Sequence, residues 1–100
     1  MLLKKWQPIV GKEVNGWRIQ KMKTKWGSCN TSTKRILLNL ELAKKPPECL
    51  EYILVHELVH LHERHHNEKF RYLMDTFFPK WRLSRETLKN EPLAHETWLY

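Results

Sequence analysis

The chain has 100 residues, of which 41% are hydrophobic, and a formal net charge of +7. This length excludes a large multidomain protein, so we expect a single domain over residues 1–100 with its core at about 17–90. Two cysteines beside six histidines exclude a disulfide-rich scaffold. The first ten residues lack the apolar stretch of a signal peptide, and no segment approaches the length of a membrane span. We therefore expect a cytoplasmic protein without a membrane partner.

The positive charge suits a negatively charged partner such as nucleic acid or an acidic protein surface. However, the lysines are spread over both halves of the chain, with only short pairs at Lys4-Lys5 and Lys44-Lys45. This spread argues against a dedicated nucleic-acid arm and favours an ordinary solvated surface. A nucleic-acid partner therefore stays open, and the sequence indicates no oligomeric state.

The first half of the chain predicts two strands. Residues 2–10 are amphipathic and are followed by turn signals. Alternating apolar and polar side chains predict a strand over Trp17–Lys23, and residues 26–33 read as a turn-rich connection. Arg35–Leu42 alternates more clearly and predicts a strand with one face against a core. Asn39 lies on its other face, where it could meet substrate or water.

The second half predicts helices. Pro47 suits the first position of a central helix that runs to about Glu63, with leucines recurring at helical spacing. Asn67 predicts the cap of a second helix that reaches Phe78. A last short helix is expected over Ser84–Lys89, followed by a loose tail. The predicted fold class is α+β, with a small β-sheet packed on the central helix and further C-terminal helices.

The central helix contains His56-Glu57-Leu58-Val59-His60. Histidines four positions apart lie one turn apart on the same helix face, so both imidazoles can bind one ion. Glu57 lies about 100° further round the helix, where it can take a proton from a metal-activated water. The pattern therefore predicts two zinc ligands and a general base. Two core histidines with hydrogen-bond partners are the simpler alternative.

Catalytic zinc usually has three protein ligands and one open position. On a continuing helix Glu63 would return to the ligand face, whereas His62 and His65 would point away. His66 follows His60 at the spacing of the extended metalloprotease motif, although that motif has glycine where this chain has Glu63. We prefer His66 as the third ligand, with Glu63 as the main alternative.

Several stretches of the chain resemble the metallopeptidase domain of the YgjP-like family. They include Met22–Cys29, Ile36–Leu40 and Tyr52–Leu61, and then His66-Asn67 and Phe70. Together with Pro47, Pro79 and Leu88 these matches extend over roughly nine-tenths of the chain in consistent order. Many members have an additional N-terminal region, so we expect this chain to be a minimal or shortened form.

The resemblance implies a zincin-like fold in which a small sheet packs on the ligand-bearing helix. It also implies that His56, His60 and His66 bind zinc and that Glu57 is the base. The helix turn without glycine is similar to that of the family and of its WLM and SprT-like relatives, which favours His66 over Glu63. Cys29 could instead be a ligand or a nucleophile, but no second residue of the sequence points to it.

Three functions follow from this pattern. The first is zinc-dependent hydrolysis of a polypeptide, with Arg35–Leu42 as an edge strand that pairs with the substrate. Tyr52, Tyr72 and Arg71 are candidate stabilisers of the oxyanion. The second is hydrolysis of a phosphate-containing substrate such as a nucleotide, for which the chain has no glycine-rich phosphate loop. The third is a non-enzymatic, zinc-stabilised module that binds DNA or protein, which requires a closed site with four ligands.

Overall fold

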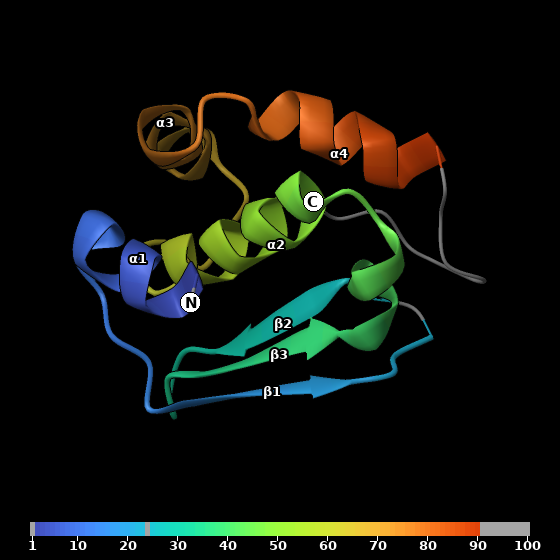
Figure 1. The fold of residues 1–100 in the computed structure, drawn as a ribbon. Coiled ribbons are helices and arrows are strands. Elements are labelled where there is room, and N and C mark those ends of the chain that lie inside the picture. Colours follow the sequence, from blue (N-terminus) through green and yellow to red (C-terminus); the bar gives the residue numbers. More distant parts are fainter. Residues whose placement is uncertain (1, 24, 91–100) are drawn as a thin grey trace.

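In the computed structural model, which describes residues 2–23 and 25–90, a small sheet lies on one side of the molecule and the α-helices on the other (Figure 1). The prediction of an α+β fold with a sheet against a central helix is therefore confirmed. In chain order the elements are α1 (Leu2–Val10), β1 (Gly16–Gln20), β2 (Gly27–Asn30), β3 (Arg35–Asn39), the 3₁₀-helix η1 (Leu40–Lys44), α2 (Pro47–Val59), α3 (Glu68–Phe77) and α4 (Trp81–Asn90).

The three strands form a mixed sheet in the order β1-β3-β2. β1 runs parallel to β3, and β2 runs antiparallel to it. Ile36 and Leu38 of β3 are buried, as their alternation predicts, and they pack toward the helices. However, β3 is the central strand, so the prediction of an edge strand at Arg35–Leu42 is wrong. The edges of this sheet are β1 and β2.

Asn39 ends β3 three residues before the predicted end at Leu42. Its Oδ1 accepts a hydrogen bond from the Glu41 N–H at 3.0 Å, which caps η1. Its Nδ2 donates to the carbonyl oxygens of Met22 and Lys25 at 2.9 and 2.7 Å. The side chain is buried, so the expectation that it meets water or substrate is wrong. It ties the connection between β1 and β2 to the end of β3.

The connection predicted at residues 26–33 contains an entire strand, which the sequence did not indicate. Gly27 pairs with Leu38, and Asn30 pairs with Arg35. β2 has no run of β-branched or aromatic residues, and its conformation comes from pairing with β3 rather than from local propensity. β1 ends at Gln20, three residues before the predicted end at Lys23.

Helix α2 passes through the centre of the molecule, and every residue of Tyr52–Val59 is buried. It ends at Val59, four residues before the predicted end at Glu63. The chain then continues with 3₁₀-type hydrogen bonds, in which Leu61 and His62 donate their backbone N–H groups to residues three positions earlier. Asn67 caps α3 through the Phe70 N–H, as predicted, whereas α4 begins at Trp81 rather than at Ser84.

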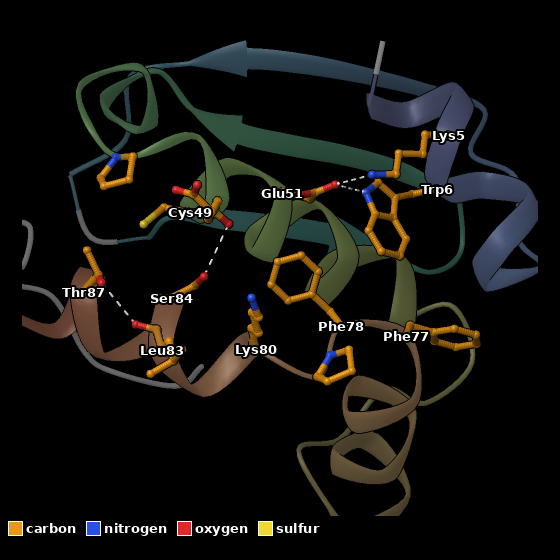
Figure 2. A pocket seen from close by; sticks show the side chains of 13 residues that line it. Lys5, Trp6, Cys49, Glu51, Phe77, Phe78, Lys80, Leu83, Ser84 and Thr87 are labelled. Carbon is orange, nitrogen blue, oxygen red and sulfur yellow. Dashed lines mark hydrogen bonds and ion pairs between the residues drawn. The ribbon is translucent and has the colours of Figure 1, made fainter.

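Helix α1 packs against α2 through Trp6, whose indole Nε1 donates to Glu51 Oε2 at 2.7 Å. Lys5 pairs with the same carboxylate at 3.1 Å. These residues and Phe78 line a cavity of about 610 Å³ between α1, the start of α2 and the start of α4 (Figure 2). The tail expected after Lys89 lies, from residue 91, outside the described residues. Within the described residues, no helix is long and apolar enough to cross a membrane.

Candidate metal centre

His56 and His60 lie one turn apart at the C-terminal end of α2. Their Nε2 atoms are 3.2 Å apart, as the spacing of four residues predicts. His56 is buried with 1% of its surface exposed, and His60, the C-cap residue of the helix, is half-buried. The pair therefore extends from the buried core at His56 to the partly exposed surface at His60.

His66 reaches the same point from the loop between α2 and α3. Its Nε2 lies 3.2 Å from that of His56 and 3.0 Å from that of His60. Because α2 ends at Val59, the chain can turn back toward His56 and His60. The three histidines thus form a cluster of candidate metal ligands.

The triangle of nitrogen atoms has the dimensions that a tetrahedral ion needs. Zinc–nitrogen bonds of about 2.0–2.1 Å place two ligand nitrogens about 3.3 Å apart. The Nδ1 of His60 lies 3.2 Å from the Glu63 carbonyl oxygen. Because a carbonyl only accepts, Nδ1 carries the proton and the Nε2 lone pair faces the other two rings. A shared cation satisfies this arrangement, so the residues fit a metal ion.

Phe70 of α3 supports all three rings. Its ring centroid lies 4.8 Å from those of His56 and His60 and 4.9 Å from that of His66. The side chain of Arg71 donates to the His66 carbonyl oxygen at 3.3 Å. The capped start of α3 therefore holds the third histidine in place, and no sequence pattern indicated this role for Phe70.

The environment keeps the three imidazoles uncharged. Burial lowers the pKa of His56 well below its usual value, and the neighbouring histidines lower it further. Burial and His66 lower the pKa of His60 to about 4, and burial lowers the pKa of His66. Neutral imidazoles at pH 7 present lone pairs, which is the form that binds a metal.

Glu57, which follows His56 on α2, is buried with 2% of its surface exposed. Burial raises its pKa to about 8, although the positive charge of Lys25 acts in the opposite direction. A Cβ at Gly27 of β2 would lie 3.1 Å from Glu57 Oε2 and 2.7 Å from Ile53 Cγ2. Glycine therefore allows the edge strand to approach the carboxylate, and this contact is a second feature that the sequence did not reveal.

The other candidates lie apart from the cluster. The carboxylate of Glu63 accepts a hydrogen bond from the His65 N–H at 3.2 Å, and only its carbonyl oxygen faces His60. His62 Nε2 lies 2.6 Å from the Val10 carbonyl oxygen, which turns that ring toward α1. Burial and the charge of Glu57 raise the pKa of Cys29 to about 12, so its thiol keeps its proton.

The three residues suggested as oxyanion stabilisers have different surroundings. Tyr52 is buried, and its ring centroid lies 5.8 Å from that of His56. Tyr72 is 69% exposed on α3. Arg71 binds the backbone of His66, as described above, and supports the loop. Of the three, Tyr52 places its ring against the ring of a candidate ligand, whereas Arg71 reaches only the backbone of one.

Comparison with known proteins agrees with this geometry. The family described as "YgjP-like, metallopeptidase domain" matches residues 1–91. The fold is similar to the crystal structure of the metallopeptidase zymogen abylysin of Pyrococcus abyssi, with a TM-score of 0.79, 23% identity and 90% of each chain covered. It is also similar to the metallopeptidase zymogen jannalysin of Methanocaldococcus jannaschii, with a TM-score of 0.68 and 25% identity over 82% of this chain and 88% of that one.

The comparison with curated proteins found no match. The fold is zincin-like, as the resemblance implied, and the histidine cluster lies where its central helix ends. The family match extends over nearly the whole chain and includes both the motif on α2 and the loop that carries His66. We conclude that this chain belongs to the YgjP-like family of metallopeptidase domains.

Proposed function

We propose that the domain is a zinc-dependent peptidase in which His56, His60 and His66 hold the metal and Glu57 is the general base. The observation that carries this proposal is the triangle of Nε2 atoms, with sides of 3.0–3.2 Å, together with the buried Glu57, which follows His56 directly on α2. The three histidines account for the whole donor group found among the described residues, which suits an open fourth position rather than a closed structural site.

The chemistry is a division of labour between the metal and Glu57. Zinc supplies Lewis acidity, which lowers the pKa of a water molecule and polarises a carbonyl group. A cation at the histidines also favours the ionised form of Glu57, whose pKa burial otherwise raises to about 8. The ionised carboxylate takes the proton of the attacking water and later gives it to the leaving amine nitrogen.

The β2 strand is the natural place for an extended substrate. Among the described strands it is an edge of the sheet, and an edge is where an extended peptide can add a further strand. Gly27 brings this edge against Glu57, which places the strand beside the base. A polypeptide aligned on β2 would present its carbonyl groups near the proposed metal site. The solved relatives are themselves metallopeptidase zymogens, which supports a peptide bond rather than a phosphoester.

The test is the Glu57→Gln variant loaded with zinc. Glutamine keeps the size of the side chain but cannot accept the proton, so turnover of an unstructured protein should fall at least 100-fold. Bound zinc, measured by atomic absorption, should stay at one ion per chain. Glu86→Gln on α4, which removes an exposed carboxylate, is the matched control. Unchanged turnover in Glu57→Gln would show that another residue is the base.

A further inference from the structure

The sheet layer concentrates the positive charge of the protein. Residues 16–46 contain eight of the 18 lysines and arginines but only one of the 11 acidic residues, which gives this segment a net charge of +7. Residues 47–100 contain seven basic and nine acidic residues. The basic residues are spread along the chain, but the acidic ones are not. The sheet and its connections therefore carry a charge equal to that of the whole chain.

The strand register places part of this charge on the outer face of the sheet. Ile36 and Leu38 point toward α2, so Arg35 and Leu37 point the other way. On β1, Trp17 and Ile19 line an apolar hollow together with Leu38, which turns Arg18 outward next to Leu37. Figure 1 shows that the described α-helices lie on the opposite side of the sheet.

Further exposed cations lie at the two ends of the sheet, next to this basic face. Lys34 and Arg35 lie at the start of β3, where the Lys34 carbonyl oxygen accepts a hydrogen bond from the Asn15 N–H. At the other end, the connection that Asn39 ties down carries Lys21 and Lys23, which are both exposed. A five-residue strand spans about 16 Å, so cations are present at both ends and in the middle of a surface of this length.

These cations have no ion-pair partner among the described residues. None of the basic-face residues, by which we mean Arg18, Lys21, Lys23, Lys34 and Arg35, forms an ion pair with another described residue. The single acidic residue of the segment, Glu41, pairs with Lys44. The five charges repel one another, and a bound polyanion would relieve that repulsion.

We propose that this basic face binds the phosphodiester backbone of a double-stranded nucleic acid. A duplex carries about one negative charge per 1.7 Å of axis, so a length of 16 Å presents about nine charges to the five cations. An acidic polypeptide, with at most one charge per residue, is less dense. A membrane surface is disfavoured because the large apolar side chains of β1 lie on the other face, and Leu37 is half-buried. The proposal does not depend on the peptidase activity.

The binding should be electrostatic and independent of base sequence. Among the described residues, the face offers charged and small polar side chains, with Ser28 beside Leu37, and no aromatic residue on which a base could stack. If all five cations contact phosphates, the logarithm of the binding constant should fall with the logarithm of salt with a slope of about −4.5. Duplex DNA and duplex RNA should both bind, because both present a phosphate backbone.

The experiment is fluorescence anisotropy of the full chain with labelled duplexes of about 20 base pairs, at about 50 to 200 mM salt. The triple variant Arg18→Gln, Lys21→Gln and Lys23→Gln should lose at least tenfold in affinity, and its salt slope should shrink to about −1.8. The matched control, Lys12→Gln, Lys80→Gln and Lys89→Gln, removes the same charge from outside the sheet. It should lose less than threefold.

Two outcomes would overturn the proposal. Equal losses in the two triple variants would mean that net charge alone attracts the duplex. Equal or tighter binding to phosphatidylserine vesicles or to polyglutamate, measured in the same buffer, would assign the face to another polyanion. Circular dichroism of each variant shows that a loss of binding is not a loss of folding. The Glu57→Gln variant should bind duplexes as the parent does. Duplex binding is therefore tested independently of the proposed peptidase activity.

Discussion

The two sides of the sheet treat ionisable residues in opposite ways. On the inner side, α2 buries His56 and Glu57, and their charged forms lose solvation, which shifts the pKa of both. On the outer side, Arg18 and Arg35 are exposed to solvent. Burying the inner groups therefore lowers the stability of the fold unless a bound ligand compensates for their lost solvation. The outer groups stay solvated, so they cost little stability and can contact a partner.

The largest effect should come from removing a proposed metal ligand on the inner side. His66→Ala should lower zinc affinity by more than 100-fold, beyond the loss expected from a supporting residue, and should abolish turnover. Glu63→Ala leaves the nitrogen triangle intact and should lower affinity by at most about tenfold, because only its backbone carbonyl contacts His60. Competition with a chromophoric chelator measures both. The reverse ranking would make Glu63 the third ligand.

A smaller effect is expected at Gly27, where the sheet meets the buried helix. Gly27→Ala places a methyl group 2.7 Å from Ile53 Cγ2, so the strand or the helix must shift. Such overpacking costs about 1–3 kcal/mol, which urea unfolding would detect. Turnover should fall as well, because Glu57 moves. Gly16→Ala is the matched control, since nothing lies within 4 Å of the added atom. Equal stability of the two variants would contradict the close packing.

The smallest effect concerns the pH dependence of the metal-free protein. The folded-state pKa values of His56 and His60 lie below 6.5, so the unfolded chain binds more protons in acid and stability falls as pH drops below about 6.5. The pKa of Glu57 is raised to about 8, so the folded state keeps a proton and stability falls as pH rises toward 8. Below pH 6.5, the unfolded state gains more protons at the two histidines than the folded state keeps at Glu57, so the net effect of acid is a loss of stability.

We therefore expect the zinc-free domain to be most stable near pH 6.5, with a slope of about 1.4 kcal/mol per pH unit for each proton involved. Urea unfolding in the presence of a chelator, repeated across this range, measures the curve. Arg18→Gln on the outer face should leave its shape unchanged. A stability profile that is flat between pH 5 and 8 would mean that the pKa values of the buried groups are not shifted by folding.

Features with a regular sequence period could be predicted, whereas features that depend on pairing between distant segments could not. The spacing of His56 and His60 was enough to place two rings on one helix face, because a helix repeats every 3.6 residues. The alternation of Ile36 and Leu38 indicated a buried strand face in the same way. By contrast, Gly27–Asn30 has no such period, and only its pairing with β3 makes it a strand. The end of α2 at Val59 depends on a turn that no residue signals.

The sequence by itself determined the local geometry of this protein: a helix with two imidazoles one turn apart, a carboxylate next to them and a strong apolar strand. Those features follow from periodicities that act over a few residues. Only the tertiary structure decided that His66 joins the pair, that Gly27 lies against Glu57, and that Asn39 is buried. These contacts join distant segments, and the packing of the whole chain settles them.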